Sequence, residues 1–173
     1  NLKTVLIEEK NELGGSTIYQ NSELYKIEND NSSDWLKKEI DELKQIKNID
    51  IKTRTSVAAF HSYNFLLARE NLTDHLTLSE RKDKIRQRLW KIRAKKVIIA
   101  TGAIERPLIF NNNDRPGILL SSAVKKYIDY FGVIGGKKSV VFTNNDSGYE
   151  TAVSLSEKGV KVNCIIDIRK KNS

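Results

Sequence analysis

The chain has 173 residues, a formal charge of +8, 39% hydrophobic residues and 30% charged residues. This apolar content is sufficient for a core and excludes wholesale disorder, and no apolar run approaches the roughly 20 residues of a membrane helix. A single cysteine, Cys164, excludes a disulfide framework; we expect it to be buried in the run VNCII, in a reducing cytoplasm. The chain lacks an initial Met and begins and ends near strands, so we expect an internal piece of a longer polypeptide.

The first half of the chain predicts a strand, a helix and an antiparallel region. Residues 3–9 predict a short strand that contains the continuous apolar run VLI, which is typical of a parallel strand covered on both faces. Ser32 and Ser33 can cap a helix that runs to about Lys47, with apolar residues at three- and four-residue spacing. Short strands and an antiparallel meander are then predicted over residues 49–60, 61–69, 73–79 and 86–93.

The second half predicts a buried strand, a helix and a β–α–β unit. Residues 96–102, KVIIATG, have the pattern of a buried strand that ends in a turn of small residues. A proline-flanked loop then leads to a helix over residues 121–131. The β–α–β unit follows, with strands at 139–143 and 160–166 around a helix at 147–158. This order favours two adjacent α/β sheets with a boundary between residues 116 and 137.

A dense basic segment, residues 81–96, contains Trp90 among its lysines and arginines. Such a segment could bind nucleic acid. The partial alternation of charged and apolar residues from Arg86 to Arg93 favours instead a hairpin strand with a solvated or partner-facing basic side. Because clustered aromatics for base stacking are also lacking, we expect no nucleic-acid partner.

The stretch VLIEEKNELGGS predicts a ligand site at the end of the first strand. An acid at the end of the second strand of a dinucleotide fold accepts hydrogen bonds from the adenosine ribose hydroxyls. Glu9 best fits the register relative to LGG, and Glu8 is the alternative. Lys10 would lie beside the adenine or a phosphate, and Gly15 lets the backbone approach a ligand closely. The alternative is an ordinary strand end whose acidic side chains are solvated.

A second motif, AKKVIIATGA, ends in Thr101 and Gly102. It resembles the strand that closes the first domain of flavoprotein reductases with two dinucleotide domains, where small residues let the chain pass under the dinucleotide. The alternative is a buried strand before a tight turn.

A third stretch, VVFTNNDSGYE, has the outline of a nucleotide-binding strand, turn and helix. Thr143 and Asn145 occupy the first two glycine positions of G-x-G-x-x-G, and Gly148 keeps the last. Asn tolerates a positive φ, but its side chain would crowd the place where phosphates sit. We therefore expect a second β–α–β domain that has lost, or much altered, ordinary NAD(P)H binding.

The stretch RQRLWKIRAKKVIIATGAIERPLIFNNNDRPGILLSSAV, followed by VVFTNNDSGYETA, strongly resembles the α subunit of heterotetrameric sarcosine oxidases. The resemblance covers nearly all the chain. It implies an α/β fold, beginning with a partial FAD/NAD(P)-binding Rossmann-like domain with an antiparallel β meander, without its first strand and G-x-G-x-x-G, over residues 1–115. A connecting loop and helix over 116–137 would precede the start of a second Rossmann-like domain over 138–173.

The resemblance implies a cytoplasmic, multisubunit oxidoreductase that acts on the CH–NH group of donors. Such complexes oxidatively demethylate sarcosine to glycine, form hydrogen peroxide and pass the one-carbon unit to tetrahydrofolate. FAD serves substrate oxidation in the β subunit, FMN lies between α and β, and the α subunit holds NAD. The alternative is the FAD-binding part of another NAD(P)H-dependent or amine- or opine-oxidising flavoprotein.

Carried over by position, the resemblance implies a set of cofactor contacts; from the residues themselves we assign no catalytic residue and expect no membrane partner. These contacts are Glu8, Glu9, Lys10, Gly15, Ser16, Val57 through its backbone near adenine, Thr101 and Gly102. Since an acid of this family usually stands at Glu8, the ribose assignment is shared between Glu8 and Glu9. His61 and His75 lack the spacing of a metal site and are expected to be surface or structural residues. Arg106 and Arg115 would either meet a phosphate or fix the proline loop.

Overall fold

The computed structural model describes residues 2–19 and 26–170. The chain divides into two units: the first comprises Asn1–Gly15 and Trp35–Thr101, the second Ser16–Asp34 and Gly102–Ser173. Each unit has its own sheets and is described by itself. The assignment of residues 1–115 and 138–173 to two dinucleotide domains stays a prediction.

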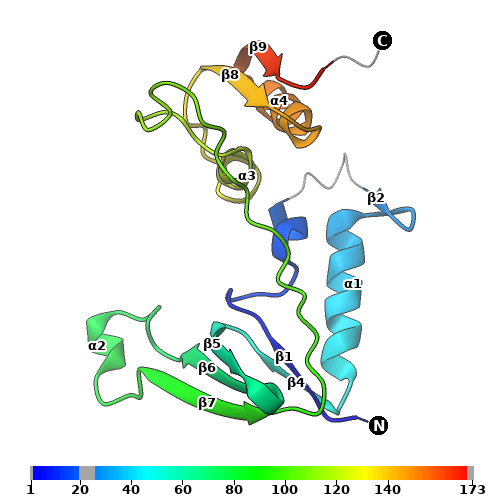
Figure 1. The fold of residues 1–173 in the computed structure, drawn as a ribbon, viewed down its shortest axis with the longest axis vertical. Helices are drawn as coiled ribbons and strands as arrows, with labels where there is room; N and C mark the ends of the chain where they lie inside the picture. Colours follow the sequence, from blue (N-terminus) through cyan, green and yellow to red (C-terminus); the bar gives the residue numbers. More distant parts are fainter. Residues whose placement is uncertain (1, 20–25, 171–173) are drawn as a thin grey trace. The chain divides into compact units, whose positions relative to one another are not determined.

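The first unit contains a parallel β–α–β arrangement. Strand β1 (Thr4–Ile7) pairs in parallel with β4 (Ile49–Lys52), and helix α1 (Ser32–Gln45) lies between them in the chain (Figure 1). The apolar face predicted for this helix is half-buried from Trp35 to Leu43, and the helix ends at Gln45, two residues before the predicted end. A parallel pair needs such a crossover, which places the carboxyl ends of both strands at the same edge.

The antiparallel meander of the first unit is a three-stranded sheet in the order β5–β6–β7 (Figure 1). Strands β5 (Thr55–His61) and β6 (Phe65–Asn71) are joined by the 3₁₀ turn η2 (Ser62–Asn64), and β7 (Gln87–Arg93) pairs along the whole of β6. The side chains of Leu66 and Ala68 in the central strand are buried. The predicted meander is therefore present.

The strand predicted over residues 73–79 was wrong, because this segment forms a loop and the short helix α2 (Leu78–Arg81). The Glu80 carboxylate accepts hydrogen bonds from the Thr77 N–H at 2.9 Å and the Thr77 hydroxyl at 2.7 Å. Arg81 donates to the carbonyl oxygens of Leu76 at 2.8 Å and Asp74 at 2.6 Å. A Thr-x-x-Glu capping box begins a helix, and this local signal outweighs the weak strand pattern.

The buried strand predicted over residues 96–102 was also wrong. Among the described residues no strand pairs with this segment, and the side chains of Ile98 and Ile99 are 92% and 69% exposed. An apolar, β-branched sequence favours a strand, but a strand also needs a neighbouring backbone to complete its hydrogen bonds.

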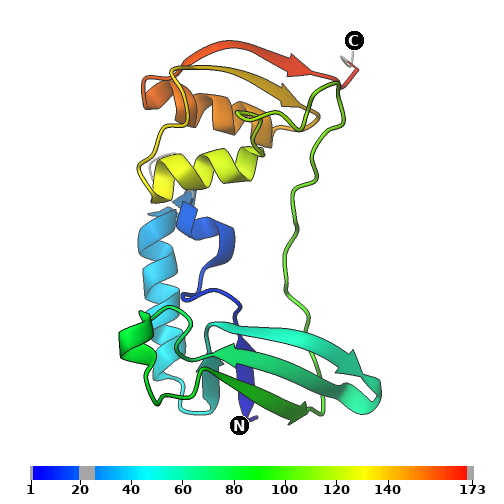
Figure 2. The ribbon, with the colours of Figure 1, turned by 90° about the vertical axis from the view of Figure 1, so that its left-hand side faces the viewer.

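The second unit is built on another parallel β–α–β arrangement. Strand β8 (Lys138–Thr143), helix α4 (Ser147–Glu157) and strand β9 (Lys161–Asp167) follow one another, and β8 pairs with β9 (Figure 2). Helix α3 (Ser121–Lys125) continues as a π-helical turn, η3 (Lys126–Tyr130), and packs beside α4. The core consists of the buried side chains of Ile128, Val141, Ala152, Leu155 and Val160.

The second unit also contains elements that the sequence did not predict. These are the 3₁₀ turn η1 (Gly15–Tyr19) and the two-residue strands β2 (Lys26–Ile27) and β3 (Asp30–Asn31). Cys164 was expected to be buried but is exposed. It is paired with Val140, whose side chain is 55% exposed, whereas the next residue along β8, Val141, is buried in the core. Successive strand residues face opposite sides, so Cys164 shares the exposed face of Val140.

The predicted α/β class, with a meander between two parallel β–α–β arrangements, is confirmed. Among the helices of the described residues, none has the length and apolar character needed to cross a membrane.

Candidate dinucleotide site

Glu8 lies directly after β1, at the carboxyl edge of the parallel pair in the first unit. Its N–H donates to the carbonyl oxygen of Lys52 at 2.9 Å, and its carbonyl oxygen accepts from the Thr55 N–H at 2.9 Å. Glu8 is therefore fixed between the end of β4 and the start of β5. Ligands of open α/β sheets bind at this carboxyl edge of the strands.

The Glu8 carboxylate is oriented by the chain that follows it. Its Oε1 accepts a hydrogen bond from the Lys10 N–H at 2.8 Å, and the Lys10 carbonyl oxygen accepts from the Arg54 N–H at 2.7 Å. Glu8 is half-buried, whereas Glu9 and Lys10 are exposed. Of the two candidate acids, Glu8 is thus the one whose backbone and carboxylate are both held in place.

Arg54 and Thr55 complete this edge, and the sequence reasoning missed both. The Arg54 carbonyl oxygen accepts from the Asn71 N–H at 2.9 Å. Thr55 is 1% exposed, and its hydroxyl donates to the Thr53 carbonyl oxygen at 2.8 Å. The stretch TRT carries no local signal for this role, because the bonds join segments that are far apart in the sequence.

The other predicted contacts occupy strand, turn and loop positions. Val57 lies on β5, with its side chain 44% exposed, where the pairing with β6 shifts between Val57 and Ala59. Thr101, the last residue of the first unit, is exposed. The structure therefore brings Glu8 and Lys10 together with the start of β5, the strand that carries Val57.

Three predicted contacts lie where the chain passes from a segment of one unit to a segment of the other. Gly15 is the last residue of the first unit's N-terminal segment, while the exposed Ser16 and Gly102 belong to the second unit. Gly102 has a φ of +69° with open space where a Cβ would stand. This left-handed conformation explains a glycine after Thr101 without any ligand.

In the second unit, the end of β8 and the start of α4 form the glycine-poor turn. Thr143 is 5% exposed, and a Cβ added to Gly148 would lie 2.5 Å from the Thr143 Cβ. Gly148 is thus required by close packing of the helix on the strand, which is the role of the third glycine in a nucleotide turn.

Side chains of the turn bond to the turn itself. The Asn145 Oδ1 accepts hydrogen bonds from the Ser147 N–H at 3.0 Å and the Ser147 hydroxyl at 2.6 Å. The Thr143 Oγ1 accepts from the Asn145 N–H at 3.1 Å and donates to the Asn145 carbonyl oxygen at 2.8 Å. The Asn145 side chain, one residue before the N-cap Asp146, therefore accepts from the first residue of α4.

An acidic and basic cluster closes the end of β9. The Arg169 guanidinium lies 2.7 Å from Asp167 and 2.8 Å from Asp146, and the Tyr149 hydroxyl donates to Asp167 at 3.1 Å. The hydrogen bonds from Arg169 lower the pKa of Asp167 to about 2. Asp167 stands at the end of the second strand of its β–α–β arrangement, where a ribose-binding acid would stand.

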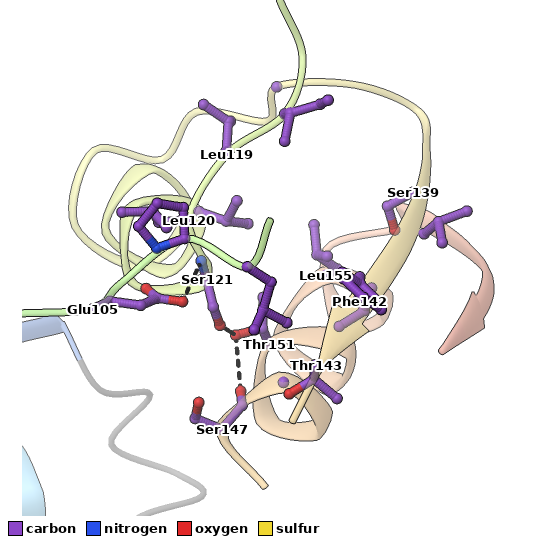
Figure 3. A pocket seen from close by; sticks show the side chains of 18 of the residues that line it. Glu105, Leu119, Leu120, Ser121, Ser139, Phe142, Thr143, Ser147, Thr151 and Leu155 are labelled. Carbon is purple, nitrogen blue, oxygen red and sulfur yellow. Dashed lines mark hydrogen bonds between the residues drawn. The ribbon is translucent and has the colours of Figure 1, made fainter. Parts of the chain in front are cut away.

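A cavity of about 1000 Å³ lies beside this turn, within the second unit (Figure 3). At one end the Ser121 and Thr151 hydroxyls are hydrogen-bonded, and the Thr151 hydroxyl donates to the Ser147 carbonyl oxygen at 3.0 Å. The Glu105 carboxylate accepts from the N–H groups of Ser121 at 3.0 Å and Ser122 at 2.7 Å. Glu105 therefore ties the preceding loop to the first turn of α3, as Figure 3 shows.

The arginines considered for phosphate binding sit in this loop region. Arg106 is exposed at the cavity, and the backbone of Arg115 takes part in turns with Asn112 and Ile118 at 3.2 Å each. The loop is thus fixed through its backbone at Arg115.

The basic segment contributes β7, where Arg88 and Trp90 are engaged with neighbouring strands. Arg88 pairs with Glu70 at 3.2 Å, and the Trp90 Nε1–H donates to the same carboxylate at 2.8 Å. The Lys52 ammonium lies 4.0 Å from the centroid of the Trp90 ring. Trp90 therefore packs within the sheet, and its indole N–H is already paired.

The two histidines are exposed. His61, at the end of β5, has its ring 5.9 Å from that of Phe65, and His75 lies in the loop before α2.

Together, the two parallel β–α–β arrangements and the antiparallel meander define an α/β protein of two units, and the proteins it is similar to are oxidoreductases. Within that class, the structure is similar to a solved L-proline dehydrogenase from P. horikoshii, with a TM-score of 0.71 and 25% sequence identity. The similarity covers 98% of this chain and 31% of the dehydrogenase chain. No family model matches the sequence.

The particular relatives are α subunits of sarcosine oxidase. The chain is 36% identical over 171 residues to the sarcosine oxidase subunit alpha of Corynebacterium sp. strain U-96, which covers 99% of this chain. It is 34% identical over 167 residues to that of Rhizobium meliloti. The resemblance seen in the motifs is thus confirmed: these residues are related to a region of the sarcosine oxidase α subunit. The chain spans 17% of the length of the first of these relatives and 16% of the second.

Proposed function

We propose that the first unit holds the adenosine end of a dinucleotide, with NAD as the cofactor and FAD as the alternative. The observation that carries this proposal is the Glu8 carboxylate, held at the carboxyl edge of β1 by the Lys10 N–H at 2.8 Å. One carboxylate offers two oxygens to the two vicinal ribose hydroxyls. The geometry favours Glu8 over Glu9 as this acid.

The remaining predicted contacts of the first unit would surround the same nucleotide. Lys10 would lie beside the adenine or a phosphate, and Val57 would contact the adenine through its backbone. Gly15 and Thr101 would allow close approach of the chain to the cofactor. Ser16 and Gly102, which belong to the second unit, stay predictions from the sequence.

We further propose that the chain is a cofactor-holding piece of an oxidoreductase that acts on CH–NH groups, with no catalytic residue of its own. The related proteins are named for oxidising sarcosine and dehydrogenating L-proline, and both compounds are secondary amines. In this proposal a β subunit carries out sarcosine oxidation at FAD, with FMN between the subunits. Hydrogen peroxide and a one-carbon transfer to tetrahydrofolate would follow in a cytoplasmic heterotetramer.

A second candidate is a related complex that oxidises a cyclic secondary amine. The structural similarity to the L-proline dehydrogenase, over 98% of this chain, favours it. Turnover of the whole complex with sarcosine and with L-proline separates the two. Faster turnover of L-proline than of sarcosine would make a cyclic secondary amine the proposed substrate.

The nucleotide proposal is tested on the full polypeptide that contains this sequence, purified with its partner subunits. Denaturation should release NAD, identified by chromatography, at about one equivalent per chain. Glu8→Gln should weaken nucleotide binding about tenfold or more, because hydrogen bonds to a charged group are lost.

Glu9→Gln is the matched control, since Glu9 is the exposed neighbour of Glu8. Its nucleotide content should equal that of the wild type. Undiminished binding in Glu8→Gln, or an equal loss in both variants, would show that Glu8 is not the ribose acid. Release of FAD in place of NAD from this polypeptide, separated from its partner subunits before denaturation, would select the alternative cofactor.

A further inference from the structure

We infer that the nucleotide turn of the second unit is filled by the protein's own side chains, so that this unit binds no dinucleotide. The Asn145 side chain bonds to the N–H at the start of α4 where a phosphate would bind. Arg169 pairs with Asp167, the acid at the end of β9. This inference goes beyond the proposed function, which concerns the first unit.

The position that a phosphate would take at the start of α4 is occupied by the Asn145 side chain. In a dinucleotide turn, the N–H groups at the start of the helix are left open for the pyrophosphate, and the first glycines keep side chains out of its way. Here the Ser147 N–H already donates to the Asn145 Oδ1 at 3.0 Å, and the Ser147 hydroxyl donates to the same oxygen at 2.6 Å. A phosphate at this N–H would have to displace the Asn145 carboxamide.

The buried Thr143 makes this arrangement difficult to open. Its hydroxyl is bonded in both directions to the backbone of Asn145, at 3.1 Å and 2.8 Å. Its side chain also fills the space beside Gly148, where a Cβ would come within 2.5 Å. The backbone of Asn145 is thus held by the Thr143 hydroxyl, and its side chain is held by the two Ser147 donors.

The acid that would bind a ribose, Asp167, is also engaged by the protein's own donors. Asp167 accepts from the Arg169 N–H at 2.9 Å, from its Nε–H at 3.1 and 3.0 Å, from its Nη2–H at 2.7 Å and from the Tyr149 hydroxyl at 3.1 Å. Both carboxylate oxygens therefore have donors before any ribose arrives. Vicinal hydroxyls would have to displace a charge-assisted pair.

The same contacts argue against a site for NADP, whose 2′-phosphate an arginine at this place would receive. The Arg169 guanidinium is already shared between Asp167 at 2.7 Å and Asp146 at 2.8 Å. Two carboxylates around one guanidinium leave a negative local charge, which disfavours a phosphate.

The test counts nucleotides on the full polypeptide with its partner subunits. Saturation with NAD, NADP and 2′,5′-ADP, followed by calorimetry, should show at most one equivalent per chain. Asn145→Ala and Arg169→Ala should leave nucleotide content and affinity unchanged. A second equivalent in the wild-type protein, or a tenfold loss of binding in either variant, would overturn the inference.

A second readout follows the turn itself. In Asn145→Ala, hydrogen exchange of the Ser147 amide should accelerate about fivefold, the usual effect of losing a side-chain acceptor at the start of a helix. Asn145→Asp keeps the acceptor and should exchange like the wild type. If Asn145→Ala leaves this exchange unchanged, Asn145 does not occupy the turn and the inference fails.

The two proposals fail independently. Loss of the first-unit nucleotide in Glu8→Gln concerns the proposed function only, because Glu8 has no part in the turn of the second unit. If the wild-type protein contains no nucleotide, the proposed function falls while the filled turn stands.

Discussion

The side chain of Thr143 fills the space that the absent Cβ of Gly148 leaves open. A Cβ on Gly148 would lie 2.5 Å from both the Cβ and the Oγ1 of Thr143 and 2.9 Å from its Cγ2. The two positions are therefore coupled: the residue that replaced one glycine of the turn makes the remaining glycine necessary.

Gly148→Ala should destabilise the protein by about 1–3 kcal/mol, the usual cost of forcing an extra carbon into a packed site. Urea unfolding of the purified protein measures this change. Gly136→Ala is the control, since a Cβ there meets nothing nearer than the Lys138 carbonyl oxygen at 3.9 Å. In a Thr143→Gly background the cost of Gly148→Ala should shrink, and an undiminished cost would contradict the coupling.

Glu105→Ala should loosen the first turn of α3, because its carboxylate accepts from the N–H groups of both Ser121 and Ser122. The loss of such a cap costs about 1 kcal/mol, so exchange of these amides should accelerate several-fold. Hydrogen exchange resolved to the peptides of α3 measures it. Arg106→Ala alters the neighbouring exposed side chain and should leave these amides unchanged.

Lys52→Gln should destabilise the protein by about 0.5–1 kcal/mol through the loss of its contact with the Trp90 ring. The ammonium lies 4.0 Å from the ring centroid and 3.0 Å from Asp50. Thermal unfolding detects the difference. Lys91→Gln changes an exposed lysine of the adjacent strand β7, and its melting temperature should match the wild type. Equal effects of both substitutions would assign the loss to net charge.

Asp129→Asn should stabilise the protein at neutral pH. Burial raises the pKa of the Asp129 carboxyl, and among the described residues its Oδ2 has no hydrogen-bond partner. The raised pKa means that the carboxyl contributes full stability below its unfolded value of 3.8 and loses it as the pH rises through the folded value. The melting temperature of Asp129→Asn should therefore exceed that of the wild type at pH 7, and the gap should narrow toward pH 4. A gap that is constant with pH would show that ionisation of Asp129 is not its cause.

Helices α1 and α4 and strands β8 and β9 could be predicted because their signals are local. The apolar spacing placed α1, although the buried Ser32 hydroxyl makes no capping bond, and the succession of strand, turn and helix placed β8, α4 and β9 to within about a residue. Thr73–Ser79 was mistaken for a strand because its Thr-x-x-Glu signal was overlooked. Lys96–Gly102 has a strand sequence, yet strand formation depends on a partner that a local pattern does not contain.

The type of residue in the candidate site could be predicted from the sequence, but its spatial arrangement could not. An acid at the end of the first strand was expected, but the register left Glu8 and Glu9 open. Only the folded backbone distinguishes them, through the bonds of Glu8 to Lys52 and Thr55. The same holds for Cys164, since the exposed side of a strand depends on which face the helix covers.

The unpaired segment around residues 96–110 has a practical consequence for handling the protein. It carries the isoleucines 98, 99, 104 and 109, which are 69–93% exposed. Short stretches of β-branched residues with free backbone groups promote association between chains and offer proteases an accessible site. Preparations of these 173 residues should therefore aggregate or be nicked first along this segment, and a charged substitution at Ile98 is a direct way to improve their solubility.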